Sequence, residues 1–287
     1  MGKKKYAVFT MDVEAFSHTE CVANAPEAAA VDLMDGFDEY IRILDKHQIK
    51  STLFTVGSLA PEIADRLRAS IRNGHRLALH GHEHIAPMDV SEEDFRTENA
   101  RAKETLQRLF DTEIQGFRAP FFSMDDRRLA ILKELGFKYD SSHLGFAKAR
   151  HTVRLELTGF KEVTKDIFRR GDFFEFGLSK QKVFGCSYPV SGGGYVRLSN
   201  WFFVKNLIRR HLRENSYYVF YLHPFELTSQ PVPVPKNLKG YDQYYLQCGI
   251  HTYGAHIEQI IRMLKKQGYS FVTFEELSQT MARQETA

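Results

Sequence analysis

Two acidic side chains follow the first apolar run of the chain. Asp12 and Glu14 stand two positions apart, directly after the apolar residues 6–11. Side chains at positions i and i+2 of a strand point to the same face, so both carboxylates are expected to face one space. Two carboxylates in one space can share a metal ion, or divide into a metal ligand and a general base. Taken alone, the pair is more typical of a solvent-exposed strand end.

Three of the 12 histidines of the chain fall within residues 80–84. His80 and His84 have the i, i+4 spacing that brings two imidazoles to one face of a helical turn, as in other zinc sites. Gly81 allows the chain to bend sharply between them. The pattern predicts a metal site with His80 and His84 as the main pair and His82 as a spare candidate. A polar surface loop is the alternative.

Three further polar residues stand at the ends of short apolar segments. Arg118 precedes a proline-stiffened turn, where a guanidinium can keep a carboxylate ionised and fix its orientation. Asp140 could orient a histidine, and His223 could act as a general acid. Taken singly, Arg118 also fits a surface ion pair and Asp140 a helix cap. Taken singly, His223 is more typical of a buried structural histidine.

Alternating elements must position these residues. Strand-like runs are expected at 6–11, 51–56, 76–79, 114–117, 137–139, 217–222 and 269–273. Helical patterns are expected at 31–47, 61–73, 91–110, 126–135, 201–213 and 254–267. Strands that alternate with helices predict parallel βαβ units, whose sites lie at strand ends. A set of about seven strands favours a barrel-like sheet over an open doubly wound sheet, which usually has about five or six.

The chain is expected to form a single α/β domain over residues 1–287. An irregular insertion is expected at about 143–200, where only short β-like pieces and the glycine run 192–194 stand out. That run lacks the Lys-Ser/Thr of a phosphate-binding loop, so a tight loop near the site is expected. The proline-rich loop 229–240 is too short for an interdomain linker.

Composition narrows the class of protein. The 287 residues are 43% hydrophobic and 26% charged, which excludes disordered, collagen-like and coiled-coil chains. The net charge of +3 disfavours a nucleic-acid partner. The 3 cysteines include no C-x-x-C pair, which favours a reducing compartment. Since the first apolar run ends before Asp12 and no run approaches the ~20 residues of a membrane span, we expect a soluble, cytoplasmic protein.

In their order, the motifs resemble those of the polysaccharide deacetylase family, also called the NodB-homology or carbohydrate esterase family 4. That family carries five motifs on a distorted (β/α) barrel. Their counterparts here are Asp12 and Glu14, His80 and His84, Arg118-Ala-Pro-Phe121, Asp140, and Leu222-His223. The resemblance spans about residues 6–275. The segments 189–197 and 221–226 resemble one branch of the family.

The sequence departs from the family pattern at three positions. Val13 separates two acids that are usually adjacent aspartates, and the second acid is Glu14. Gly81 stands where serine or threonine is usual, and Phe121 stands where tyrosine is usual. The family uses the backbone N–H at this last position, which phenylalanine retains.

The resemblance implies a role for each matched residue. Glu14, His80 and His84 would bind one divalent metal ion, zinc. Asp12 would be the general base, and Arg118 would keep it ionised and oriented. The Phe121 N–H would help to stabilise the oxyanion. His223 would protonate the departing amine, with Asp140 as its orienting partner.

The implied activity is hydrolysis of the N-acetyl group of an amino sugar in a polysaccharide or its precursor. A metal-dependent amidase acting on a small non-sugar amide or cyclic imide is the alternative. A carbohydrate-binding protein without catalysis is a third hypothesis, which the complete motif set disfavours. The sequence leaves the sugar, the acyl group, the native metal and the oligomeric state open. The early end of the first apolar run favours a cytosolic or lipid-linked precursor as the N-acetylated substrate.

Overall fold

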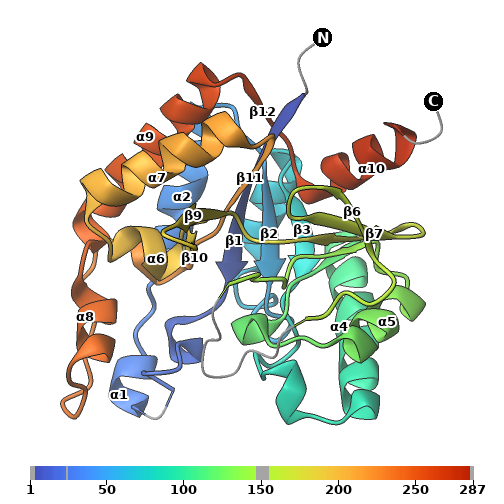
Figure 1. Ribbon diagram of the computed structural model, residues 1–287. Helices are drawn as coiled ribbons and strands as arrows, with labels where there is room; N and C mark the ends of the chain where they lie inside the picture. Colours follow the sequence, from blue (N-terminus) through green and yellow to red (C-terminus); the bar gives the residue numbers. More distant parts are fainter. Residues whose placement is uncertain (1–3, 24, 147–154, 285–287) are drawn as a thin grey trace.

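A curled, mostly parallel β-sheet forms the centre of the protein, whose computed structural model describes residues 4–23, 25–146 and 155–284 (Figure 1). The parallel strands are β1 (Lys5–Val13), β2 (Ser51–Thr55), β3 (Arg76–Leu79), β4 (Gly116–Phe117), β5 (Tyr139–Asp140), β8 (Phe173–Phe176), β11 (Tyr217–Phe220) and β12 (Tyr269–Phe271). Their order is β11-β1-β2-β3-β4-β5-β8, and β12 pairs with the start of β1.

Two more strands, β6 (Lys161–Thr164) and β7 (Ile167–Arg170), extend this sheet beyond β8 in antiparallel orientation. A separate hairpin is formed by β9 (Lys180–Val183) and β10 (Cys186–Pro189). The main sheet curls into a half-barrel, with seven parallel strands along its main path. The predicted distorted barrel of a single α/β domain is therefore confirmed.

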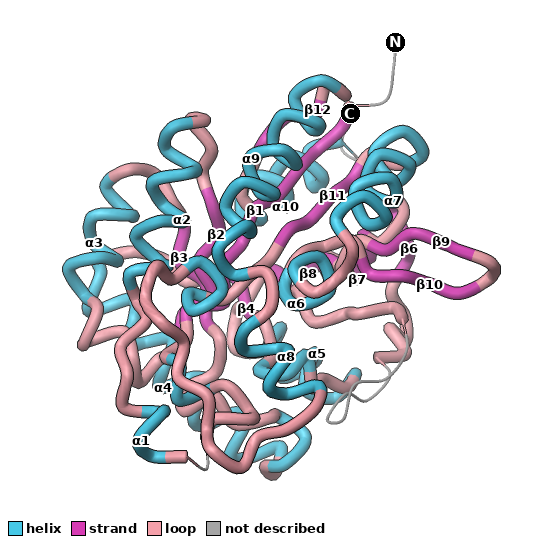
Figure 2. The backbone as a smooth tube through the Cα atoms, turned by 90° about the vertical axis from the view of Figure 1, so that its left-hand side faces the viewer, coloured by secondary structure: helices cyan, strands magenta, loops and turns pink. Residues whose placement is uncertain are grey.

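Helices connect the strands and lie around the outside of the sheet (Figure 2). The α-helices are α1 (Pro26–Ala29), α2 (Asp35–Lys46), α3 (Ala64–Arg72), α4 (Glu92–Phe110), α5 (Asp126–Glu134), α6 (Gly193–Arg197), α7 (Trp201–Glu214), α8 (Tyr241–Gln247), α9 (Ile250–Lys266) and α10 (Phe274–Gln284). Short 3₁₀ helices are η1 (Phe16–His18), η2 (Pro87–Asp89), η3 (Pro120–Phe122) and η4 (Pro224–Leu227). None of the described helices is both long and apolar enough to cross a bilayer.

The structure changes several predicted boundaries. The strands predicted at 114–117 and 137–139 become β4 and β5, of two residues each. The segment 143–200 supplies β8, which pairs with β5 in the main sheet. Its sequence, Phe-Phe-Glu-Phe, is buried at all four positions, so it lacks the alternation that marks a half-exposed strand.

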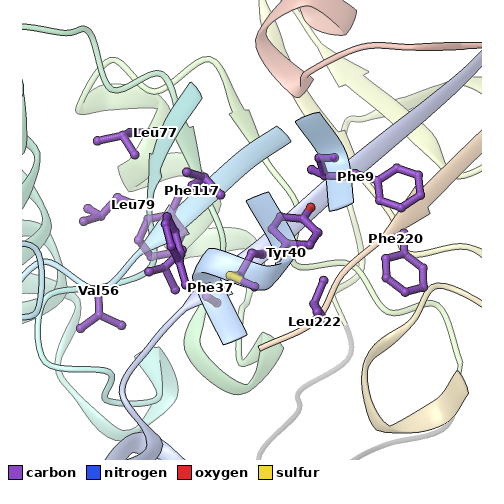
Figure 3. Close-up of a cluster of buried hydrophobic side chains, with 14 of the residues drawn as sticks. Phe9, Phe37, Tyr40, Val56, Leu77, Leu79, Phe117, Phe220 and Leu222 are labelled. Carbon is purple, nitrogen blue, oxygen red and sulfur yellow. The ribbon is translucent and has the colours of Figure 1, made fainter. Parts of the chain in front are cut away.

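Residues of β1 alternate between two packing environments. Phe9 and Met11 belong to the core between sheet and helices, together with Phe37 and Tyr40 of α2 (Figure 3). Tyr6 and Val8 belong to a second core inside the half-barrel. Because a strand has a period of two, residues 10 and 12 continue the inward series. The fold therefore directs the first acid of the chain into the interior.

Candidate active site

The predicted site residues gather where the parallel strands end. Asp12 lies near the end of β1, His80 follows β3, Arg118 follows β4 and His223 lies three residues beyond β11. Backbone hydrogen bonds continue the sheet through this edge, from Asp12 N to Leu222 O (2.9 Å) and from Arg118 N to Leu79 O (3.0 Å). A cavity of about 550 Å³ opens there. Its lining includes Asp12, Glu14, His18, His80, His84, Phe121, His223, Tyr241, Asp242 and Tyr245.

Glu14, His80 and His84 form a buried cluster with the composition of a metal site. One ligand atom of each lies within 4.8 Å of the others. His84 Nε2 is 2.6 Å from Glu14 Oε2, and His80 Nε2 is 3.8 Å from it. One carboxylate and two imidazoles suit zinc and leave coordination positions open, as catalytic sites require.

The tautomer of His80 favours metal binding. Its Nδ1 lies 2.8 Å from the backbone oxygen of Arg118. Since a carbonyl only accepts, Nδ1 carries the hydrogen, and the lone pair of Nε2 faces Glu14. Metal-binding histidines use such a second hydrogen bond to fix the ring. The donor set and its support therefore fit a divalent ion.

Charge states in the cluster also suit ligands. Burial lowers the pKa of His80 to about 4, which keeps this imidazole neutral near neutral pH. Burial favours the neutral form of Glu14, yet His84, His223 and His80 around it hold its pKa well below the usual range. A carboxylate and a neutral imidazole are the forms that bind metal.

The segment after β3 reaches the site without forming a helical turn. Residues 80–86 form bends and irregular chain. Positive φ angles at Gly81 (72°) and His84 (54°) turn His84 toward Glu14. His82 is directed elsewhere, with Nε2 3.1 Å from the Glu83 carboxylate. The helical turn inferred from the spacing is therefore absent, and the spare candidate His82 lies outside the cluster.

Arg118 fixes the direction of the Asp12 carboxylate. This fully buried guanidinium donates from Nη1 to Asp12 Oδ1 (2.5 Å) and to Thr10 Oγ1 (3.0 Å). Its Nε and Nη2 donate to the backbone oxygen and hydroxyl of Ser141, each at 3.0 Å. Its carbon Cζ lies 4.1 Å from the Phe54 ring centre. With so many contacts, the guanidinium has one orientation, and Asp12 takes its direction from it.

His223 stands beside Asp12 and is oriented by Glu226. His223 Nε2 is 4.0 Å from Asp12 Oδ2, while Nδ1 is 3.1 Å from Glu226 Oε2. The His223 backbone N–H donates to the same oxygen at 3.0 Å. The other oxygen of Glu226 accepts from Arg197 Nε at 2.8 Å, and both of these side chains are buried. Although burial opposes it, Glu14, Glu226 and Asp12 raise the pKa of His223 to about 9.

Asp140 does not have the partner that was predicted for it. Its two oxygens accept from Ser142, at 2.9 Å from the backbone N–H and 3.0 Å from the hydroxyl. The Ser142 hydroxyl in turn accepts from the Ala119 N–H at 2.9 Å, next to Arg118. Because β5 and β8 pair in register, Asp140 also faces Glu175 in the interior. Asp140 therefore supports, through Ser142, the backbone next to Arg118. The residue that contacts His223 Nδ1 is Glu226 instead.

Phe121 lies at the metal cluster. Its backbone has φ 55° and ψ 14°, and its ring centre is 4.8 Å from that of His84. The left-handed backbone follows Pro120 in η3 and reverses the chain at the cavity wall. The structure thus brings this residue to the predicted place, and its oxyanion role stays a prediction.

Several cavity residues carry no sequence signal. The His18 ring stacks on His84 at 5.1 Å, with an angle of 15° between the planes. Tyr241, Asp242 and Tyr245 of α8 form another part of the wall. They lie more than 150 residues from the histidine motif, and no spacing rule links them to it. Glu226 had a visible signal, since it follows His223 by three residues in the segment His-Pro-Phe-Glu.

Sequence comparison identifies the family of one part of the chain. Residues 30–139 match the family model described as polysaccharide deacetylase, and residues 150–278 match a domain of unknown function. Residues 30–139 therefore resemble the polysaccharide deacetylases, the family that the order of the motifs also points to. Chitin deacetylase 1 of Cryptococcus neoformans var. grubii is 27% identical over 96 residues, which cover 33% of this chain and 20% of that protein. The match thus spans about a fifth of that relative.

Solved structures with the same fold cover nearly the whole chain. A Mycobacterium smegmatis protein assigned to the polysaccharide deacetylases has a TM-score of 0.66 at 17% identity, over 99% of this chain and 93% of that one. The carbohydrate esterase domain of a xylanase from the hindgut metagenome of Trinervitermes trinervoides has a TM-score of 0.53 at 15% identity, over 98% and 92%. A Bacillus anthracis pseudoenzyme of carbohydrate esterase family 4 has a TM-score of 0.54 at 14% identity, over 96% of this chain and 66% of that one. At identities of 14–17%, these likenesses show the fold alone.

Proposed function

We propose that this protein is a metal-dependent N-deacetylase that hydrolyses the N-acetyl group of an amino sugar. The observation that supports it most is the buried cluster of Glu14, His80 and His84, with Asp12 and His223 beside it in one cavity. The cluster supplies metal ligands, and the other two supply a base and an acid. Together these are the groups that amide hydrolysis by water requires.

Each residue then has a defined task in the reaction. A divalent ion held by Glu14, His80 and His84 would polarise the acetamide carbonyl and acidify the attacking water. Asp12, held by Arg118, takes a proton from that water. The Phe121 N–H donates to the carbonyl oxygen as negative charge develops there. His223 gives a proton to the departing nitrogen, so that acetate and a free amine leave.

The cavity wall favours a sugar over a small non-sugar amide. Tyr241 is 69% exposed at the cavity, and its ring stacks toward Tyr245 with centres 6.4 Å apart. Asp242 beside them offers a carboxylate. Aromatic faces can cover the C–H face of a sugar ring, while a carboxylate accepts hydrogen bonds from hydroxyls. A substrate of one small ring would leave this wall unused.

Completeness of the site separates the proposal from a binding protein without catalysis. The base, the acid and three metal-binding side chains are all present and lie within one cavity. A pseudoenzyme of this fold is among the similar structures, so the fold by itself does not imply turnover. The proposal therefore rests on the side chains.

Acetate release from a panel of substrates tests the proposal. N-acetylated sugars, nucleotide sugars, lipid-linked sugars and a cyclic imide are each incubated with protein that has been loaded with zinc or treated with chelator. Opening of the imide ring releases no acetate and is measured separately. We expect acetate from at least one amino sugar, its loss with chelator and its return with added zinc. Hydrolysis of the imide alone would support the small-amide alternative. Sugar binding without hydrolysis in any metal-loaded sample would contradict an enzymatic role.

A further inference from the structure

Large aromatic side chains are exposed on the hairpin and on the adjacent helix α7. Phe184, at the turn between β9 and β10, is 103% exposed, relative to an extended reference. Phe202 and Phe203, in the first turn of α7, are 76% and 45% exposed. Water-exposed phenylalanine has no hydrogen-bonding group, so a group of them on neighbouring elements indicates a surface that contacts something apolar.

The hairpin is held against α7, so these side chains belong to one side of the molecule. His211 Nδ1 of α7 lies 3.0 Å from the backbone oxygen of Lys180 in β9. The Tyr188 ring of β10 meets the Phe203 ring edge-on, with centres 5.5 Å apart. Figure 2 shows the hairpin projecting from the body beside α7. Phe184 therefore lies at the outer end of a hairpin whose base packs against α7.

Basic side chains accompany the aromatic ones. Phe202, Asn206, Arg209 and Arg213 follow one another at four-, three- and four-residue spacing, and all are exposed. Residues at this spacing lie along one stripe of a helix. The opposite face of α7 is buried, through Val204, Leu207, Ile208, His211 and Leu212.

The cations of this surface are available to a partner. Arg209 donates to the neutral amide of Asn206 at 3.2 Å, whereas Arg210 pairs with Glu214 at 2.8 Å. Lys182 of β9 is exposed and stands two residues before Phe184. In the part of the chain that the structure describes, Lys182, Arg209 and Arg213 form no ion pair with a carboxylate.

We propose that this surface, the α7–hairpin surface of Lys182, Phe184, Phe202, Phe203, Arg209 and Arg213, binds an anionic lipid bilayer. Phenylalanine rings would enter the boundary between headgroups and acyl chains, and the cations would contact lipid phosphates. The combination of unpaired cations with apolar rings distinguishes this surface from the cavity wall, where tyrosines stand beside a carboxylate. The inference is independent of the reaction proposed above.

Vesicle binding tests the proposal with the full chain. Sedimentation with phosphatidylcholine vesicles that contain ~30% phosphatidylglycerol measures binding, and phosphatidylcholine vesicles alone provide the comparison. We expect preferential binding to the anionic vesicles, weakened by salt. Phe184→Ala combined with Phe202→Ala should lower binding by about tenfold or more, and Arg209→Glu by about fivefold or more. These positions are exposed, so melting temperatures should stay near that of the wild type.

Arg127→Glu is the matched control, because it makes the same charge change at an exposed position of α5. It should bind vesicles like the wild type. A wild-type protein that does not bind anionic vesicles overturns the proposal. If Arg209→Glu and Arg127→Glu lose vesicle binding equally, net charge alone explains the loss, and the proposal is overturned as well. If the phenylalanine variants bind vesicles normally but lose binding to a soluble polysaccharide, the surface binds carbohydrate instead.

Discussion

At the scale of single residues, the two acids after β1 have separable tasks. Asp12 contacts Arg118, whereas Glu14 contacts His84. In Asp12→Asn, Arg118 retains Thr10 as a hydrogen-bond acceptor, and the metal cluster keeps all its side chains. We expect near-normal zinc content and acetate release lowered by ~10²- to 10⁴-fold, because the base is lost. Zinc content and the rate of acetate release, measured on one sample of the variant, check this. Loss of zinc would show that Asp12 is the metal ligand and Glu14 the base.

Glu226 is expected to act through His223. Glu226→Gln keeps an oxygen for Arg197 but removes the charge that orients the imidazole and favours its protonated form. We expect amide hydrolysis to fall by ~10- to 100-fold, as for other residues that support a reacting group. Hydrolysis of an activated ester should fall much less, since its leaving group needs little protonation.

Comparing amide with ester hydrolysis also shows whether Glu226→Gln disturbs only the orientation of His223 or distorts the whole site. A distorted site would lower ester and amide hydrolysis alike, and thermal unfolding would report lost stability. Equal losses on both substrates would therefore contradict the role of Glu226 in proton donation.

At the scale of elements, α2 packs directly against the segment that carries His223. A Cβ atom added at Gly36 of α2 would lie 1.8 Å from the backbone oxygen of Pro224, the first residue of η4. Gly36→Ala must therefore displace η4 and with it His223. We expect a loss of stability of about 1–3 kcal/mol and a clear fall in turnover, measured by chemical denaturation and acetate release.

Gly254→Ala in α9 is the matched control for this packing. A Cβ there would have no neighbour closer than 3.5 Å. Alanine favours a helix over glycine by roughly 0.5–1 kcal/mol, so stability should be kept or increased. Equal behaviour of the two variants would contradict close packing of α2 on η4.

At the scale of the whole molecule, the buried carboxyl pair Asp140 and Glu175 links stability to pH. Burial raises the pKa of Asp140 to about 6. Burial and the neighbouring Asp140 raise the pKa of Glu175 well above its usual value. A carboxyl with a raised folded-state pKa binds more protons in the folded state. Its stabilising contribution is therefore full below the unfolded pKa of about 4 and is lost as pH rises through about 6.

Glu175→Gln is expected to flatten this pH dependence. The amide oxygen still accepts from the Ser142 and His143 N–H groups that now contact Glu175 Oε1. The variant should exceed the wild type in free energy of unfolding at about pH 8, by on the order of 1 kcal/mol, and the difference should shrink toward about pH 4. Urea unfolding at several pH values checks this. Parallel curves for the two proteins would contradict the assignment.

Metal binding should also stabilise the whole fold, because Glu14 is far along the chain from His80 and His84. An ion at about 100 times its dissociation constant contributes roughly 2.7 kcal/mol, since it binds the folded state only. We expect zinc to raise the melting temperature of metal-free protein by about 4–5 °C. His84→Ala should abolish the rise and His82→Ala should retain it. An equal rise in both variants would place the ion elsewhere.

Much of the architecture follows from local pattern. The apolar run at 6–11 and the helical patterns at 61–73 and 91–110 predict elements that the structure contains, because such patterns depend on residues that are near one another in the chain. The order of motifs at strand ends likewise predicts that Asp12, His80 and Arg118 meet at one edge. A cytoplasmic location stays a prediction of composition.

Only the tertiary structure decided the partners of the site. His80 and His84 have a spacing that suits a helical turn, yet positive φ angles brought His84 to Glu14 and turned His82 away. Asp140 and Glu226 are both acids, and the sequence alone does not decide which of them contacts His223. The register of β5 against β8 drew Asp140 to Ser142 and Glu175, and the buried Arg197 fixed Glu226 beside His223. Such choices depend on contacts between residues far apart in the chain, which periodicity and spacing do not encode.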